Sequence, residues 1–489
     1  MPSPSRALLP ALALLVSLAG CSDPPPLPTH VVLVSIDTLR PDRLGAYGHR
    51  EDVSPTIDRL AREGVSFEQA IAASTWTLPS HAALLTSLWP AMLDLGRFDA
   101  PAKVSDTATT LAEVLDDAGY RTFAATAGAF VGAEFGFDQG FDTFLPPQKR
   151  FEPAVERALA WIDEAADDDA DAPCFVFLHT YDVHNYVATA GDRRRFVAPS
   201  FRSFLATKRN LGKFLQRNDK KVCENMGARD WLYPPARYDA AVATADRTLG
   251  RLVDGLAARG MLDDTMLIVT SDHGEEFGEH GRSGHGYTVY DENIRVPLIL
   301  RHPPSLPPAR VPAQVPLIDV APTVVDLLGL EPPPSWQGRT LAPLLDGDGP
   351  SRPAFVSDTH VPHLAVRDDG FKYFLSSMRP YEHLYDLSSD PRERKNVVAS
   401  HEERAAEALD RLARFAERAG AETRYAGADL TPSDDALRSL EQFGYLSGGG
   451  DSGPDDDRPP RFDWSALIER VRREAAERRA ATTGGADHR

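Results

Sequence analysis

The chain has 489 residues, of which 42% are hydrophobic, and it carries a formal net charge of −19 at pH 7. This length and apolar content predict a globular body with a large core and room for two domains. The negative balance argues against a nucleic-acid partner, because it would repel the phosphate backbone.

Residues 1–21 resemble a bacterial lipoprotein signal peptide. A positive Arg6 precedes an apolar run over 7–18, which is too short to span a membrane comfortably. The run ends in the lipobox Leu18-Ala19-Gly20-Cys21, which implies lipidation of Cys21 and a membrane anchor. The alternative is an ordinary secretory signal in which Cys21 is incidental. Ser22 after the cysteine favours the outer membrane and periplasm of the cell envelope, and residues 22–29 would form a tether.

Strand and helix signals alternate over residues 30–345, which predicts an α/β fold with a mostly parallel sheet sandwiched by helices. Ser54 as cap, Pro55 in the first turn and Gly64 at the end mark the first helix. Further helices are expected over 110–118, 238–259 and 319–328. Buried strands are expected from the apolar runs at 30–34, 174–178 and 266–269.

Three segments depart from this alternation. Residues 193–221 carry ten Lys or Arg and one acid. They predict either a solvated insertion or a basic wall that attracts an anionic substrate, with phenylalanines among the charges that help it dock. Residues 346–447 predict a smaller C-terminal domain with strands at 354–356, 364–366 and 371–374. Residues 448–489 predict a disordered linker followed by a charged helix.

Polar side chains follow the predicted strands at the edge where parallel sheets bind ligands. Asp37 follows the first strand and Asp272-His273 follows another, and these side chains suit a divalent cation. Thr77 lies where Pro79 and Ser80 indicate the start of a helix. A hydroxyl there, beside a cation, is a candidate nucleophile, because the helix N-terminus and the metal both stabilise its anion.

Histidines supply the remaining candidates. His184 is predicted to bind the substrate oxygens or to protonate the leaving group, and His285, between two glycines, is either a leaving-group acid or a ligand of a second metal. Candidates for contact with the substrate are His81, Arg40 and His179, although each of these side chains could instead brace the loops.

Taken together, these segments are similar to the sulfatase family of the alkaline-phosphatase superfamily over residues 31–445. Further matching segments are 290–298, 317–323 and 384–391. The resemblance implies an alkaline-phosphatase-like domain with a smaller C-terminal α+β sheet domain, and metal-dependent ester hydrolysis. It also implies that Asp37, Thr77, Asp272 and His273 hold a divalent cation. Calcium, manganese and zinc remain open, and the nitrogen ligand favours the last two.

The chain departs from the family at the nucleophile. Formylglycine sulfatases carry Cys or Ser, any residue, and then Pro-Ser-Arg, whereas this chain begins the motif with Thr77 and ends it with His81. Formylglycine is made from Cys or Ser, so the chain is predicted to be a threonine-nucleophile variant. A sulfated threonine cannot collapse to an aldehyde and has to be cleared by water at sulfur, whereas a phosphorylated threonine is cleared more readily by water.

Three functions are compatible with these observations. Overall similarity predicts hydrolysis of sulfate esters on an anionic substrate such as a polyanionic glycan. The chemistry of Thr77 favours a phosphodiesterase, a phosphonate monoester hydrolase or an envelope phospho-group transferase. The third alternative is a catalytically silent lipoprotein that keeps the fold for binding.

Overall fold

The computed structural model describes residues 26–484 except 99, 170–171, 199, 216–224, 346, 348, 369, 429, 431, 434–436, 439 and 441–461. The predicted signal peptide with Cys21, residues 22–25 of the tether, and the predicted linker up to residue 461 therefore lie outside the described residues. Within the described part of the chain, no helix is long and apolar enough to cross a membrane.

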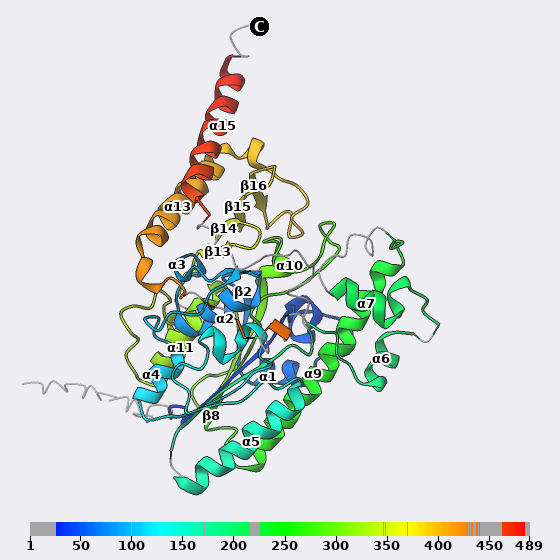
Figure 1. Ribbon diagram of the computed structural model, residues 1–489, viewed down its shortest axis with the longest axis vertical. Coiled ribbons are helices and arrows are strands. Elements are labelled where there is room, and N and C mark those ends of the chain that lie inside the picture. The colour runs from blue at the N-terminus through cyan, green and yellow to red at the C-terminus, as the bar shows by residue number, and fades with distance from the viewer. Residues whose placement is uncertain are drawn as a thin grey trace, which may run out of the picture.

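An eight-stranded sheet forms the centre of the large domain (Figure 1). Its strands, in spatial order, are β12 (Ala309–Pro316), β2 (Val65–Ile71), β11 (Arg295–Arg301), β8 (Thr265–Thr270), β1 (His30–Ile36), β7 (Cys174–Thr180), β5 (Arg121–Ala125) and β6 (Thr143–Phe144). All the described pairings in it are parallel except those of β11, which runs antiparallel to β2 and β8. The prediction of a mostly parallel sheet is confirmed.

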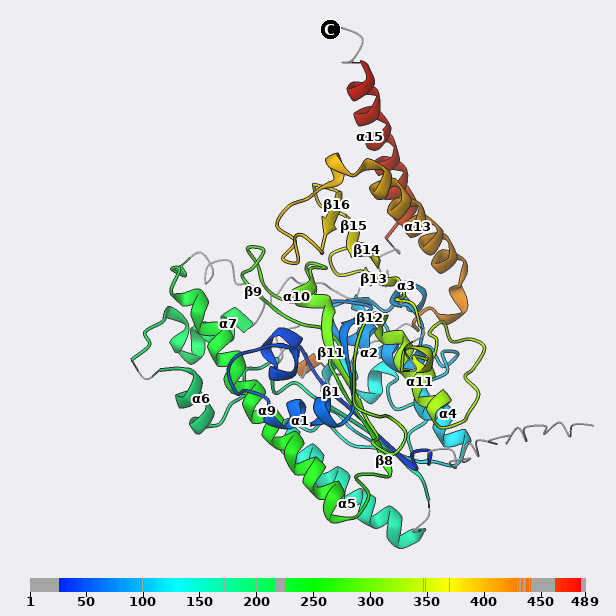
Figure 2. The ribbon, with the colours of Figure 1, turned by 180° about the vertical axis from the view of Figure 1, so that it is seen from behind.

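Helices cover both faces of this sheet, as predicted (Figure 2). One face packs against α1 (Pro55–Glu63), α5 (Phe151–Asp168) and α9 (Tyr233–Ala258). The other packs against α2 (Thr77–Thr86), α4 (Leu111–Asp117) and α11 (Val320–Leu327). Strands buried on both sides require apolar residues throughout, which is why their sequences show continuous rather than alternating hydrophobicity.

The helix starts are explained by local sequence, with one exception. Thr110 and Glu113 form a reciprocal capping box at α4, in which each side chain accepts a bond from the other residue's backbone N–H. Ser54 was expected to cap α1, but its hydroxyl donates to the Asp58 carboxylate at 3.1 Å and makes no cap bond. Ser54 thus occupies the N-cap position, but the expected side-chain cap bond is absent because the acid one turn later takes the hydroxyl.

A four-stranded antiparallel sheet forms the smaller C-terminal unit, in the order β13 (Ala354–Asp358), β14 (His363–Asp368), β15 (Phe371–Ser376) and β16 (Glu382–Asp386). Long helix α13 (Glu402–Ala421) covers one face, and α15 (Trp464–Gly484) packs on α13. Lys372 is fully buried between Asp291, at 2.9 Å, and Glu393, at 2.7 Å. This network ties the small sheet to short helix α10 (Asp291–Ile294) of the large domain.

The remaining short elements lie at the edges of the large domain. They are α3 (Pro90–Leu93), α6 (Ala190–Phe196), α7 (Lys208–Leu215), α12 (Ala342–Leu345), and the strand pairs β3 (Gly96–Arg97) with β4 (Ala100–Pro101) and β9 (Glu276–Phe277) with β10 (Ser283–Gly284).

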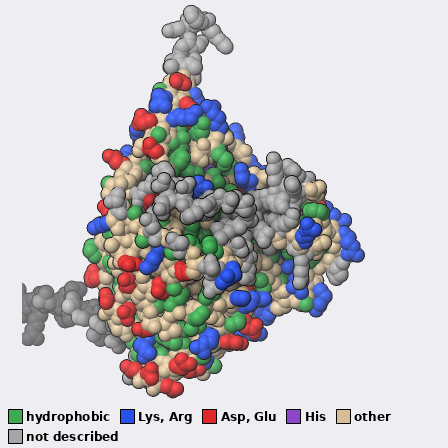
Figure 3. All heavy atoms as spheres, in the orientation of Figure 1, with side chains coloured by type: hydrophobic (Ala, Val, Ile, Leu, Met, Phe, Trp, Pro, Cys, Tyr) green, Lys and Arg blue, Asp and Glu red, His purple; other side chains and the backbone are tan. Residues whose placement is uncertain are grey.

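The described part of the basic segment forms a lobe of α6 and α7 beside α9, with arginine side chains along its outer edge (Figure 3). Its phenylalanines were expected to help the lobe dock on the body. Phe196 packs against the main core, and Phe201 and Phe214 form a small core with Tyr233 of α9. Phe204 is exposed, so the expectation holds for three of the four phenylalanines and is wrong for Phe204.

Candidate active site

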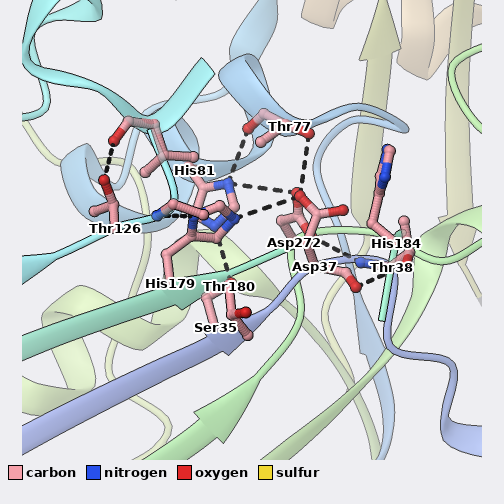
Figure 4. A network of polar contacts seen from close by, with 12 residues as sticks. Ser35, Asp37, Thr38, Thr77, His81, Thr126, His179, Thr180, His184 and Asp272 are labelled. Atoms are coloured by element: carbon pink, nitrogen blue, oxygen red, sulfur yellow. Dashed lines mark hydrogen bonds and ion pairs between the residues drawn. The ribbon is translucent and has the colours of Figure 1, made fainter. Parts of the chain in front are cut away.

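Three neighbouring strands deliver the candidate ligands to one edge of the sheet. Ser35 of β1 is in register with His179 of β7 and with Thr270 of β8, so the segments that come after these strands start side by side. Asp37 and Asp272 come directly from two of those segments. Figure 4 shows the two carboxylates next to each other, with Thr77 above them.

Thr77 is the first residue of α2 and is fully buried. Its hydroxyl donates to Asp37 Oδ2 at 3.2 Å and lies 3.4 Å from His273 Nε2. The helix places free backbone N–H groups at the same point, which stabilises negative charge there. The structure therefore brings together the nucleophile and ligand residues that the sequence suggested.

Asp37, Asp272 and His273 present ligand atoms that all lie within 4.8 Å of one another. All three side chains are completely buried, and among the described residues Asp37 Oδ1 has no hydrogen-bond partner. Burial and the neighbouring Asp272 carboxylate raise the pKa of Asp37 well above its ordinary value, and burial also raises the pKa of Asp272. Two buried carboxylates with an orphaned oxygen fit a divalent cation, which would supply the missing positive charge.

Two buried histidines contact these ligand residues. His81 Nδ1 lies 3.0 Å from the Thr77 carbonyl oxygen and 3.4 Å from Asp272 Oδ2. His179 Nε2 lies 3.5 Å from Asp37 Oδ2. Burial lowers the pKa of both imidazoles, that of His179 strongly, which favours their neutral forms. Both rings are completely buried, so in the described structure they hold the ligands in place, and contact with substrate stays a prediction.

His184 and His285 complete a row of imidazoles that starts at His273. The ring centroids of His273 and His285 are 4.4 Å apart, and those of His285 and His184 are 5.0 Å apart. His184 lies after β7, whereas His285 comes from the glycine-flanked loop after β10. His184 and His285 thus meet beside His273, which neighbours Thr77. At that position an imidazole can donate a proton to the leaving group of an ester.

Comparison with known proteins gives the family. The sequence profile described as "Sulfatase" matches residues 29–330, which is more than half of the chain. The chain belongs to the sulfatase family. It is a sulfatase-like hydrolase, and the predictions of family, fold and enzyme class are confirmed. A second profile, "N-sulphoglucosamine sulphohydrolase, C-terminal", matches residues 278–417.

Similar curated proteins include the N-acetylglucosamine-6-O-sulfatase of Bacteroides thetaiotaomicron, at 24% identity over 82% of this chain and 88% of the relative. Human arylsulfatase A is 26% identical over 80% of this chain and 86% of its own length. Among solved structures, a protein in complex with its substrate D-glucosamine-2-N,6-O-disulfate gives a TM-score of 0.66 at 20% identity, covering 81% of this chain and 99% of the other. The phosphonate monoester hydrolase of Agrobacterium radiobacter gives 0.64 at 23%, covering 80% and 96%.

Arg40 lies in a separate ion-pair cluster. Its guanidinium contacts Asp42 and Glu279, each at 2.8 Å, and donates to the Glu275 carbonyl at 2.6 Å. Its ring partner is Phe277, 4.6 Å away. These bonds brace the loop after β8, and a substrate contact by Arg40 stays a prediction.

Sequence reasoning missed the hydroxyl groups that shape the ligand loops. Ser80 donates to the Asp272 carbonyl at 2.5 Å, and Ser271 donates to the His273 carbonyl at 2.8 Å. Tyr238 donates to the Thr38 carbonyl at 2.7 Å from helix α9. Ser80 and Ser271 carry a local signal, because they lie within three residues of predicted site residues. Tyr238 carries none, since only tertiary packing brings α9 to the loop.

Glu275 is a second residue that sequence reasoning passed over. Its side chain is 4% exposed, and its Oε2 atom has no hydrogen-bond partner among the described residues. Burial raises its pKa to about 8. A buried acid two residues after a metal ligand is a signal that the sequence Asp272-His273-Gly274-Glu275 does contain.

Proposed function

We propose that this protein hydrolyses sulfate esters of an anionic glycan and that Thr77 is its nucleophile. The observation that carries this proposal is the Thr77 hydroxyl, which lies at a helix N-terminus within 3.2 Å of Asp37 and 3.4 Å of His273. The glycan class is supported by the similarity of the chain to an N-acetylglucosamine-6-O-sulfatase. Chemistry and substrate thus rest on separate lines of support.

Asp37, Asp272, His273 and the Thr77 hydroxyl would hold the divalent cation. When bound, such a cation polarises the ester oxygens and lowers the pKa of a neighbouring hydroxyl. The Thr77 hydroxyl already donates to Asp37, so its proton has an acceptor. Thr77 Oγ1 then attacks sulfur, the bond from sulfur to the sugar oxygen breaks, and a sulfated threonine forms. The helix N-terminus stabilises the charge that develops on the sulfuryl oxygens.

The departing sugar oxygen needs a proton. His285 and His184 lie in the imidazole row beside His273, and we assign one of them as the acid that supplies it. Water attacks sulfur in the second step, which releases sulfate and restores the Thr77 hydroxyl. This step replaces the aldehyde exit that a formylglycine hydrate would use.

A second candidate is hydrolysis of phosphate diesters or phosphonate monoesters. The observation that favours it is Thr77 itself, because a threonine cannot use the formylglycine exit and a phosphorylated threonine is opened by water more readily. The imidazole ligand His273 suits zinc or manganese, which act on phosphoryl groups in many enzymes.

The test is a matched panel of aryl sulfate, aryl phosphate and bis-aryl phosphate, each assayed with added calcium, manganese or zinc. A preference for aryl sulfate supports the first candidate, and a strong preference for the diester overturns it in favour of the second. Accurate intact mass after a substrate pulse distinguishes a sulfated from a phosphorylated Thr77. Absence of metal-dependent turnover on every substrate, including sulfated glycans, would contradict both.

The cellular location of the protein is also a proposal. The lipobox at Leu18-Ala19-Gly20-Cys21 supports an enzyme anchored through lipidated Cys21 in the bacterial envelope, on the outer membrane. Metabolic labelling with a palmitate analogue tests it. Wild-type protein is expected to take up the label and Cys21→Ala is expected to lose it, whereas equal labelling of the two would contradict the anchor.

A further inference from the structure

A cavity of about 580 Å³ lies between α3, β13 and α13, where the large domain meets the C-terminal sheet. Figures 1 and 2 both show these three elements together beyond the end of α2. Helix α2 begins at Thr77 and runs for ten residues before the chain turns into α3. At a rise of about 1.5 Å per residue, the cavity starts about 15 Å from the nucleophile. It is therefore separate from the active site.

One wall of this cavity is apolar. Trp89, which caps the start of α3, packs with Phe355 of β13 and Phe415 of α13. The ring centroids of Trp89 and Phe355 are 5.4 Å apart, and those of Phe355 and Phe415 are 4.3 Å apart. The side-chain amide oxygen of Gln337 accepts from the Trp89 backbone N–H at 3.1 Å, and its amide nitrogen donates to the Met92 sulfur. The wall is thus held rigidly, and the partly exposed ring of Phe355 offers aromatic surface of the kind on which sugar rings pack.

Basic side chains also line the cavity. Arg339, Arg352 and Arg418 line the cavity against a single acid, Glu422. Arg352 is fixed by an ion pair with the buried Asp319. Arg339 and Arg418 are exposed. The charge of Arg339 interacts with Asp319, which Arg352 already pairs, and among the described residues Arg418 makes no ion pair with an acid. Three arginines face two acids, Asp319 and Glu422, so in a chain whose net charge is −19 the cavity carries a local excess of positive charge that suits an anion.

We infer that this cavity binds a sulfated sugar unit of a polyanionic glycan, at a distance from the catalytic centre. The volume falls in the range of small-ligand sites, the aromatic wall fits the apolar face of a sugar, and the exposed guanidiniums of Arg339 and Arg418 fit its sulfate groups. This inference rests on the proposed function, because it takes the same polymer as ligand. A chain held here has an increased effective concentration of its other sulfate esters at Thr77.

The prediction separates long substrates from short ones. Removal of Arg418 or Arg339 should lower kcat/KM on a sulfated polysaccharide by about threefold each, and by about tenfold together, as expected for partly exposed charge pairs. Neither change should alter kcat/KM on a small aryl sulfate, which cannot reach both sites. The matched control is Arg414→Ala, which removes an exposed arginine from the same helix but not from the cavity.

The experiment measures both substrates with wild type, R418A, R339A, the double variant and R414A, and checks folding by the thermal midpoint. Binding of a sulfated oligosaccharide, its desulfated form and inorganic sulfate is measured in parallel by calorimetry on the T77A background. The inference expects the double variant to lose affinity for the sulfated oligosaccharide only. If inorganic sulfate binds equally well, the cavity is a free-anion site and the inference fails.

Equal loss on polymer with R414A, or no loss with the double variant, would also overturn the inference. Either outcome leaves the proposed function intact as long as the polymer is still desulfated. Failure of wild type to desulfate any substrate would instead contradict the proposed function. The two failures are therefore distinguishable in one set of assays.

Discussion

Replacement of Thr77 by valine removes the proposed nucleophile while keeping its shape. The hydroxyl lies 3.2 Å from Asp37 Oδ2 and 3.4 Å from His273 Nε2, and the side chain is completely buried. Loss of a nucleophile that acts as a unit with its activating groups reduces kcat by at least about 10⁴-fold. That factor corresponds to about 5.4 kcal/mol of transition-state stabilisation.

The assay is kcat on the best ester of the panel at saturating metal, with Thr86→Val as matched control. Thr86 ends the same helix, is equally buried, and donates its hydroxyl to the Ala82 carbonyl at 2.7 Å, away from the ligands. We expect the control to keep kcat within about twofold, because its lost bond affects only stability. Thr77→Ser should retain measurable turnover. If T77V keeps its rate within tenfold of wild type, the nucleophile assignment is refuted.

Metal removal should make stability fall as pH rises above about 4, the ordinary range of an aspartate. The reason is that the pKa of Asp37 is raised in the folded state, so the folded protein keeps a proton that the unfolded chain has lost. A thermal midpoint in chelator that is no lower at pH 8 than at pH 5 would contradict this pH dependence. His285→Ala should cost at least tenfold more on a sugar sulfate than on a nitrophenyl sulfate, because only the poorer leaving group needs its proton. Lys372→Met should lower the free energy of unfolding in urea by about 3–5 kcal/mol, because it leaves Asp291 and Glu393 buried without their cation. A loss below 1 kcal/mol would contradict that assignment.

The ligand set could be predicted from the sequence because each member carries a local signal. Asp37 and Asp272 come after apolar runs that can only be buried strands, and parallel strands deliver the residues after them to one edge of the sheet. Thr77 precedes a proline and a serine that start a helix. Local chemistry and general topology were sufficient there.

The rest depends on tertiary contacts that leave no local mark. Arg40 was predicted either to contact the substrate or to brace the loops, and the bracing depends on Glu279, which contacts it at 2.8 Å from a loop distant in the sequence. The antiparallel direction of β11 is set by its place between β2 and β8, not by its composition. The ion pairs of a side chain and the direction of a strand depend on neighbours that are distant in the sequence. The local sequence around a residue therefore cannot predict them.

The most direct test of the account is a crystal structure with manganese or zinc, using anomalous diffraction to locate the ion. We expect an anomalous peak within about 2.0–2.6 Å of oxygens of Asp37 and Asp272 and of His273 Nε2, with Thr77 Oγ1 in the same shell. A peak that lies elsewhere, or a bound ion from which the Thr77 hydroxyl is turned away, would contradict the central claim.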